Sequence, residues 1–178
     1  MSGRLTDEHI LVTGGSRGIG AAIVEKCLQE GANVSFIDLE VEEGENLPTK
    51  LNQDSKLLFV RGNVCSAEDL KSWSNASRKK FGSITGLVNN AGILDYGPFE
   101  WSSPQGFKRV MDVNFYGIVN LTRECMPLLR AGCGRIVNVA SIAGLVSIPL
   151  SVSYCCSKYA VEAFSDGLRR ELQAFAGM

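Results

Sequence analysis

The stretch Thr13-Gly14-Gly15-Ser16-Arg17-Gly18-Ile19-Gly20 decides the fold. It follows a short apolar run at residues 9–13 and precedes residues 19–30, whose apolar residues have helical spacing. That spacing predicts an apolar helix face, and Gly31 predicts where the helix ends. The face would comprise Ile19, Ala22, Ile23, Cys27 and Leu28. A glycine-rich turn between a strand and a helix is typical of a βαβ unit with a parallel sheet.

The rest of the chain continues this alternation of strand and helix. Further apolar runs predict strands at residues 33–38, 57–60, 84–88 and 135–140. Helical periodicity predicts helices at residues 40–53 (interrupted by Pro48), 67–81, 107–129 (bent or frayed at Pro127) and 154–175. The strand segments are almost continuously apolar, as in a sheet covered on both faces. We therefore expect a doubly wound α/β sheet, a Rossmann fold, in one domain spanning residues 1–178.

Composition excludes several other classes of protein. Hydrophobic residues make up 45% of the 178 residues, enough for a packed core, and the formal net charge is −1. Interspersed charges of both signs give no basic surface for nucleic acid. The acidic run at residues 40–45 is interpreted as a solvated helix face. Six cysteines without a CxxC pair, and a lone His9, predict no metal site.

Two stretches bear on membranes and secretion. No charged residue stands between Arg135 and Lys158, a span long enough to cross a bilayer, but Asn138, Gly144 and Pro149 interrupt it. A strand, an apolar loop and a helix start explain this span better, so we expect no integral membrane segment. Residues 2–8 are polar and charged, unlike a secretory signal, which predicts a cytoplasmic protein with reduced thiols.

The glycine-rich loop has the features of a phosphate-binding turn. A dinucleotide pyrophosphate needs backbone N–H groups at a helix N-terminus and no β-carbon in its way. Gly14 would allow the tight turn, Gly18 the approach of the phosphates, and Gly20 the packing of the helix on the sheet. The spacing is TGxxxGxG, not the general GxGxxG.

Two charged residues bear on the choice of dinucleotide. Asp38 ends the second predicted strand, 18 residues after Gly20, where a carboxylate can accept hydrogen bonds from the ribose hydroxyls of NAD. The same carboxylate would repel the 2′-phosphate of NADP, whereas Arg17 could attract that phosphate. We expect NAD to be preferred over NADP, because Asp38 lies at the ribose itself.

Five motifs, in order and in spacing, resemble the short-chain dehydrogenase/reductase family over essentially the whole chain. The motifs are Thr13 to Gly20, Asn89-Asn90-Ala91-Gly92, Asn114, Ser141 and Tyr154-Cys155-Cys156-Ser157-Lys158. The resemblance implies an NAD(P)-dependent oxidoreductase that interconverts an alcohol and its carbonyl. It also implies that Ser16, Arg17 and Ile19 contact the cofactor together with the loop glycines.

The residue types support acid–base chemistry. Tyr154 and Lys158 stand at i and i+4, so they share one face of a helix, and a nearby ammonium favours a phenolate. Tyr154 could then exchange a proton with an alcohol or carbonyl. Ser141, 13 residues earlier, can hydrogen-bond the substrate oxygen. By resemblance, Lys158 also holds the nicotinamide ribose, and Asn114 anchors a water that relays protons to Lys158.

Further positions match the family less closely. Asn90, Ala91 and Gly92 resemble the segment that lines the adenosine side of the cofactor and stabilises the sheet. Asn63-Val64 stand where the family usually has Asp-Val beside the adenine; the Asn63 carbonyl could still accept from the adenine amino group. Residues 162–172 resemble the retinol and hydroxysteroid dehydrogenase branch. The apolar loop at residues 142–152 suits a hydrophobic alcohol or, alternatively, packs in the core.

The resemblance also predicts what should follow the catalytic helix. The family normally continues with two more strands, a helical segment over the substrate and a Pro-Gly turn near the nicotinamide, whereas this sequence stops at Met178. We therefore expect a C-terminally truncated chain with the final strands missing and the fifth strand at a sheet edge. The alternative to an active enzyme is a catalytically silent nucleotide-binding or partner-binding fragment. By resemblance, the helices around Asn114 and Tyr154 form a homodimer or tetramer face.

Overall fold

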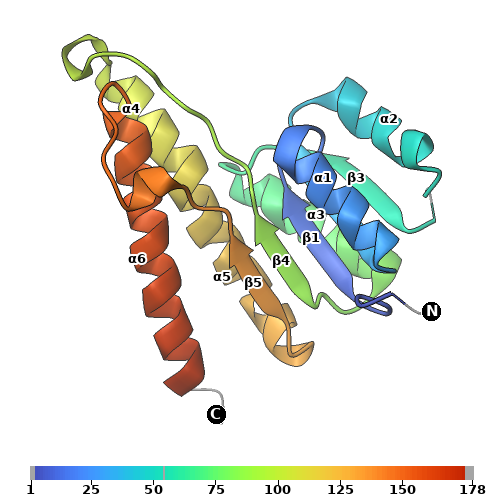
Figure 1. Cartoon of the computed structure of the whole chain (residues 1–178). Helices are drawn as coiled ribbons and strands as arrows, with labels where there is room; N and C mark the ends of the chain where they lie inside the picture. The colour runs from blue at the N-terminus through green and yellow to red at the C-terminus, as the bar shows by residue number, and fades with distance from the viewer. Residues whose placement is uncertain (1–2, 54, 175–178) are drawn as a thin grey trace. The chain divides into compact units, whose positions relative to one another are not determined.

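A parallel sheet of five strands organises the chain in the computed structural model, which describes residues 3–53 and 55–174. The strands are β1 (His9–Thr13), β2 (Asn33–Asp38), β3 (Leu57–Arg61), β4 (Gly86–Asn89) and β5 (Arg135–Asn138). Their order in the sheet is β3-β2-β1-β4-β5 (Figure 1). The expected doubly wound α/β sheet is therefore confirmed. The order reverses direction between β1 and β4, which is where ligands bind in such sheets.

Of the described residues, those up to Ala91 and those from Ile118 to Val137 form one compact unit. Those from Gly92 to Gly117 and from Asn138 onward form a second unit. We call them the first and second units and describe each by itself. The expectation of one domain over residues 1–178 stays a prediction.

Helices cover both faces of the sheet in the first unit. They are α1 (Gly18–Gln29), α2 (Val41–Leu51), α3 (Ala67–Phe81) and α5 (Gly117–Ala131) (Figure 1). On one face, Leu11 of β1 and Ile37 of β2 pack in a buried cluster with Trp73 of α3 and Leu121 of α5. Trp73 Nε1 donates to Ser35 Oγ at 2.7 Å, which satisfies the one polar atom of the indole ring.

The opposite face carries the alternate residues of the same strands, as the two-residue period requires. Phe36 is fully buried there and its ring lies 5.2 Å from that of Phe59. A β-carbon on Gly44 of α2 would lie 2.4 Å from the Phe59 ring, so the helix sits on the aromatic ring itself. This packing holds the C-terminal edge of β2, where Asp38 stands.

The second unit is built around α6 (Val152–Ala174). Three elements pack against this helix: α4 (Pro104–Met111), a π-helical turn η2 (Asp112–Tyr116) and a short 3-10 turn η3 (Ile142–Gly144). Another 3-10 turn, η1 (Phe99–Trp101), lies in the same unit. The Phe115 and Phe164 rings meet edge to face at 6.2 Å and join η2 to α6. Phe175, the expected last residue of this helix, lies outside the described residues.

Three local expectations are wrong. The helix expected over residues 107–129 begins at Pro104 and changes to a π turn at Asp112–Tyr116 before α5. Pro48 does not interrupt α2, which continues past it to Leu51, and the amide of Gln53 bonds to the Pro48 carbonyl at the end of the helix. The buried face of α1 is made by Gly20, Val24 and Leu28, whereas the Ile19 side chain is 66% exposed.

None of the helices that the structure describes combines the length and the apolar character needed to span a bilayer.

Candidate cofactor and catalytic sites

The glycine-rich loop ends at the N-terminus of α1, in the first unit. Arg17 is the N-cap residue and makes no side-chain capping bond, and the first turn holds no acidic residue. The first amides of a helix have no intrahelical partner, so those of α1 are available to an anion. A β-carbon on Gly18, whose φ is +55°, would meet nothing within 4 Å. The space in front of these amides is thus open, and the loop fits a pyrophosphate.

Gly20 has the opposite environment. A β-carbon there would lie 1.9 Å from the Gly14 carbonyl oxygen and 2.7 Å from Asn90 Nδ2. The helix start therefore lies directly on the loop, whereas the sequence analysis assigned Gly20 to the packing of the helix on the sheet.

Asn90 and Thr13 connect the ends of β4 and β1. Asn90 Nδ2 donates to the carbonyls of Thr13 and Gly14, each at 3.0 Å. Thr13 Oγ1 accepts from the amides of Asn90 and Ala91, each at 2.9 Å. These four bonds fix the shape of the glycine-rich loop from outside it, at the point where the strand order reverses.

Asp38 lies at the end of β2 with its carboxylate fixed by backbone amides. Oδ2 accepts from Ser16 N at 3.0 Å, and Oδ1 accepts from the amides of Leu39 and Glu40 at 2.8 and 3.3 Å. A carboxylate has about four acceptor sites, so roughly one remains for a ribose hydroxyl. The residues present therefore fit the adenosine ribose of a dinucleotide.

Asn63 and Val64 follow β3. Asn63 Oδ1 accepts from Cys65 N at 2.9 Å, and Asn63 N donates to Asp69 Oδ2 at 2.8 Å. The carbonyl that was expected to meet the adenine thus already has one partner and retains a second lone pair. Val64 packs against the buried core cluster of the sheet.

Tyr154 and Lys158 lie on α6, in the second unit. Lys158 is buried, and its Nζ donates to the Val139 carbonyl at 2.8 Å and lies 5.6 Å from the centre of the Tyr154 ring. Burial lowers the pKa of Lys158 from its ordinary value, because desolvation penalises the ammonium. The sequence expectation that the two side chains share a helix face agrees with this arrangement.

Asn114 is fully buried in the π turn. Its Oδ1 accepts from Ile93 N at 2.8 Å, and its Nδ2 donates to Ile93 O at 2.9 Å and to Ser157 Oγ at 3.0 Å. Ser157 Oγ donates in turn to the Tyr154 carbonyl at 2.7 Å. A β-carbon on Gly92 would contact both Asn114 Oδ1 and Lys158 Nζ, at 3.4 and 3.8 Å. Asn114, Gly92 and Lys158 therefore meet at one point.

Ser141 precedes the η3 turn, which packs against α6. Its Oγ accepts from Ala143 N at 3.1 Å, and its hydroxyl has no acceptor of its own within residues 3–53 and 55–174. A β-carbon on Gly144 would lie 2.8 Å from the Lys158 carbonyl, so the turn that carries Ser141 closes onto α6 beside Lys158. The hydroxyl is left free to donate to a ligand.

Sequence reasoning missed three contributors to these sites. The Val139 carbonyl holds Lys158, Ser157 links Asn114 to Tyr154, and Glu40 forms an ion pair with Arg17. Ser157 was identifiable, because it lies within the Tyr-x-x-x-Lys motif. The other two depend on tertiary contacts. No group of three potential metal ligands was found among the described His, Cys, Asp and Glu residues.

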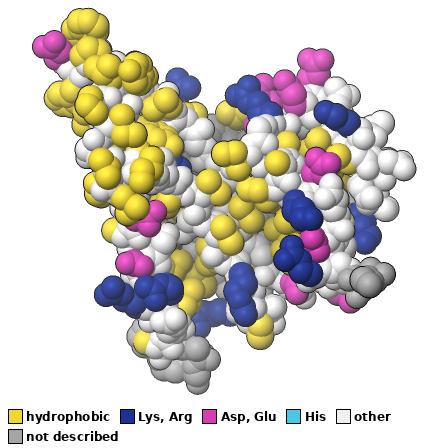
Figure 2. All heavy atoms as spheres, viewed as in Figure 1, with side chains coloured by type: hydrophobic (Ala, Val, Ile, Leu, Met, Phe, Trp, Pro, Cys, Tyr) yellow, Lys and Arg dark blue, Asp and Glu magenta, His cyan; other side chains and the backbone are white. Residues whose placement is uncertain are grey.

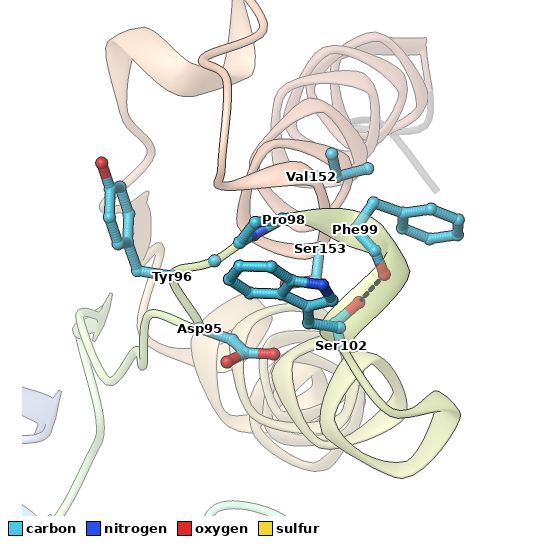
Figure 3. Close-up of a pocket in the computed structure, with 9 residues that line it drawn as sticks. Asp95, Tyr96, Pro98, Phe99, Ser102, Val152 and Ser153 are labelled. Carbon is cyan, nitrogen blue, oxygen red and sulfur yellow. Dashed lines mark hydrogen bonds between the residues drawn. The ribbon is translucent and has the colours of Figure 1, made fainter.

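The apolar loop at residues 142–152 is mostly exposed, which contradicts the alternative of core packing. Figure 2 shows hydrophobic side chains gathered on the surface of the second unit. In the loop, Leu145 and Val146 are 64% and 60% exposed. A pocket of about 150 Å³ lies beside the end of the loop. Val152, Phe99 and Tyr96 contribute to its wall, and Ser102 Oγ donates to the Phe99 carbonyl at its edge (Figure 3).

Comparison with known proteins defines the class. The family model described as short chain dehydrogenase matches residues 8–175. The chain therefore belongs to the short-chain dehydrogenase family, whose dehydrogenases act on CH–OH groups.

Its relatives differ in the substrates that their names state. The chain is 37% identical over 174 residues to retinol dehydrogenase 16 of Rattus norvegicus, covering 96% of this chain and 54% of the relative. It is also 37% identical over 163 residues to 2-(S)-hydroxypropyl-CoM dehydrogenase 3 of Xanthobacter autotrophicus, covering 90% and 64%. The chain thus spans about half the length of the retinol dehydrogenase that it matches.

A solved structure is similar over most of this chain. It is a short chain dehydrogenase/reductase from Burkholderia phymatum in complex with NAD, with a TM-score of 0.92 and 27% identity. The match covers 96% of this chain and 62% of that one. A nicotinamide dinucleotide is therefore supported as the cofactor of the fold.

Proposed function

We propose that this chain carries the cofactor-binding and proton-transfer residues of an NAD-dependent oxidoreductase that interconverts a hydrophobic alcohol and its carbonyl. The observation that carries the proposal is the buried Lys158, held by the Val139 carbonyl with its Nζ 5.6 Å from the Tyr154 ring centre. Lys158 and Tyr154 thus lie together on one face of α6, and a tyrosine hydroxyl is a side chain that can exchange a proton with an alcohol or a carbonyl.

The residues of the second unit have different roles in the proposed reaction. When bound, the nicotinamide would accept the hydride from the alcohol carbon. Tyr154 takes the hydroxyl proton as the C–O bond becomes a carbonyl, and returns it in the reverse reaction. The Ser141 hydroxyl donates a hydrogen bond to the substrate oxygen. Lys158 keeps two N–H donors beyond the one used by Val139, which are available for the cofactor ribose.

Asn114 supports this arrangement through its hydrogen bonds. The link from Asn114 through Ser157 to the Tyr154 carbonyl fixes the first turn of α6 on the π turn. We propose that Asn114 also anchors the water that passes protons to Lys158, since Lys158 Nζ and Asn114 Oδ1 both lie beside Gly92.

A hydrophobic alcohol is the proposed substrate class because the loop that follows Ser141 exposes apolar side chains. Ile142, Leu145 and Val146 are 66%, 64% and 60% exposed and lie close together in the sequence. Contiguous exposed apolar surface is typical of a ligand-binding or interaction site. The name of the retinol dehydrogenase relative is consistent with this class of substrate.

We propose NAD as the cofactor, because Asp38 occupies the end of β2 with one acceptor site remaining. Gly14, Ser16, Gly18 and Ile19 would contact its pyrophosphate side. A homodimer or tetramer and a cytoplasmic location remain predictions.

The test is turnover of a panel of primary and secondary alcohols with NAD by wild type and Tyr154→Phe. The variant lacks the proton-transfer group, so turnover should fall about 10²–10⁴-fold while NAD affinity is unchanged. Tyr116→Phe is the matched control: Tyr116 is half-exposed, makes a ring contact with Phe115 and should keep wild-type turnover. Wild-type turnover in Tyr154→Phe would contradict the proposed role.

The alternative is a nucleotide-binding or partner-binding chain without activity of its own. β5 lies at the sheet edge, and its side chains are alternately exposed and half-buried, so its backbone edge can pair with another strand. Saturable NAD binding without turnover of any alcohol would favour this alternative.

A further inference from the structure

We propose that Glu40 helps to set the cofactor preference: it holds Arg17 in an ion pair and keeps that cation from the 2′-phosphate that distinguishes NADP from NAD. The inference rests on the proposed function, because it assumes that the loop at residues 13–20 binds a nicotinamide dinucleotide. Arg17 is the cation within that loop, and so the one group there that would favour NADP.

The ion pair joins two helix starts. Arg17 is the N-cap residue of α1 and Glu40 is the N-cap residue of α2, and Arg17 Nη2 lies 3.4 Å from Glu40 Oε1. The backbone of Glu40 is fixed independently of this pair. Ser16 Oγ donates to the Glu40 carbonyl at 3.3 Å, and Glu40 N donates to Asp38 Oδ1 at 3.3 Å. The backbone of Glu40 is therefore held beside both the loop and the Asp38 carboxylate, independently of the conformation of the Glu40 side chain.

The surrounding charges favour the same outcome. Glu42 and Glu43 line a groove of about 290 Å³ that also includes Ser16. Lys50, in the last turn of α2, is the cation of that groove. A 2′-phosphate near Asp38 would thus meet two carboxylates and one ammonium in this groove, and Arg17 would add a second cation only after leaving Glu40. The acidic run that looked like a solvated helix face includes the residue that restrains Arg17.

The expected effect is modest because the pair is exposed. The Arg17 and Glu40 side chains are 71% and 44% exposed, and such pairs correspond to about a two- to fivefold change in an equilibrium constant. Removing the Glu40 carboxylate should therefore tighten NADP binding by about two- to fivefold. NAD has no 2′-phosphate, so its affinity should stay within about twofold.

The experiment is calorimetric titration of the 178-residue chain with NAD⁺ and, separately, with NADP⁺. The variants are Glu40→Gln, Arg17→Ala and the double variant. Glutamine keeps the size and the backbone contacts of Glu40 while removing its charge. Glu43→Gln is the matched control, because it removes the same charge from the same helix start without touching the pair. A pH of about 7.5 keeps the 2′-phosphate fully ionised, since its second pKa is about 6.

The expected result is a gain in NADP affinity for Glu40→Gln that disappears in the Arg17→Ala background and exceeds the gain for Glu43→Gln. No gain for Glu40→Gln in a chain that binds NAD would overturn this inference and leave the proposed function standing. An equal gain in the Arg17→Ala background would also overturn it, because Glu40 would then act by repulsion alone. Binding of neither dinucleotide by wild type would refute the proposed function, and this inference with it.

Discussion

Two glycines on helices should respond in opposite directions to the same substitution. Gly20 begins α1, where an added β-carbon would lie 1.9 Å from the Gly14 carbonyl oxygen. Gly167 lies inside α6, where an added β-carbon would meet nothing within 4 Å. Gly167→Ala is therefore the matched control for Gly20→Ala.

The magnitudes follow from helix propensity and steric overlap. Alanine stabilises a helix interior relative to glycine by about 0.5–1 kcal/mol, and this is the whole effect expected at Gly167. At Gly20 the overlap is with backbone, which cannot rotate away, and overpacking of this kind costs about 1–3 kcal/mol. One kcal/mol shifts the melting temperature of a chain of this size by about 2–4 °C. We expect Gly20→Ala to melt about 2–12 °C lower than wild type, and Gly167→Ala about 1–4 °C higher.

The two tryptophans make the assay specific. Trp73 is fully buried in the first unit, which contains Gly20, whereas Trp101 is 78% exposed. The emission shift on unfolding therefore reports on Trp73, and far-UV circular dichroism follows α6 for Gly167→Ala. Gly20→Ala should also weaken NAD binding, because the loop must move to accommodate the methyl group. A Gly20→Ala protein as stable as wild type would refute the close contact between α1 and the loop.

Other substitutions test the buried polar groups. Asn114→Ala removes three hydrogen bonds and leaves the Ile93 backbone groups unpaired, so it should lose about 2–4 kcal/mol in urea unfolding. His9 is buried, and its ring meets that of Phe81 edge to face at 5.1 Å. Burial lowers the pKa of His9 below its ordinary 6.5, so its contribution to stability is present above pH 6.5 and is lost as the pH falls below that value. His9→Leu should flatten the fall in melting temperature between about pH 7 and 5.

For each of these two predictions, one outcome would contradict the reasoning. An Asn114→Ala protein with unchanged stability would mean that the Asn114 side chain does not form these hydrogen bonds in the wild type. A pH profile that is the same for wild type and His9→Leu would place the acid sensitivity in other groups.

Most of the fold was predictable because the apolar runs and helical spacings are strong and alternate regularly. The prediction was least accurate at element ends, where tertiary contacts decide. β5 was expected to reach Ala140 but ends at Asn138, since the Val139 carbonyl accepts from Lys158. The start of α4 is marked in the sequence by a capping pattern. Ser103 caps the Gly106 amide and Pro104 takes the first helical position, a common N-terminal pattern.

The candidate site residues were predicted by motif, but their partners were not. Spacing places Tyr154 and Lys158 on one face, yet it contains no information on the carbonyl that holds Lys158. The π turn around Asn114 was also missed, because one extra residue per turn leaves the apolar pattern nearly unchanged over a short segment. Ion pairs such as Arg17–Glu40 join residues distant in sequence and depend on the packing of two helices.

The four hydrogen bonds that join Thr13 and Gly14 to the Asn90 side chain and to the Asn90 and Ala91 amides have a consequence for biosynthesis. They join residues more than 70 positions apart, so the glycine-rich loop cannot take its final shape on a nascent chain that ends before Ala91. At about 5–20 residues per second, the ribosome needs several seconds to add the intervening segment. A dinucleotide could stabilise the nascent chain only after β4 has emerged and paired with β1, which makes ligand-dependent protease resistance of stalled chains a direct readout of that docking step.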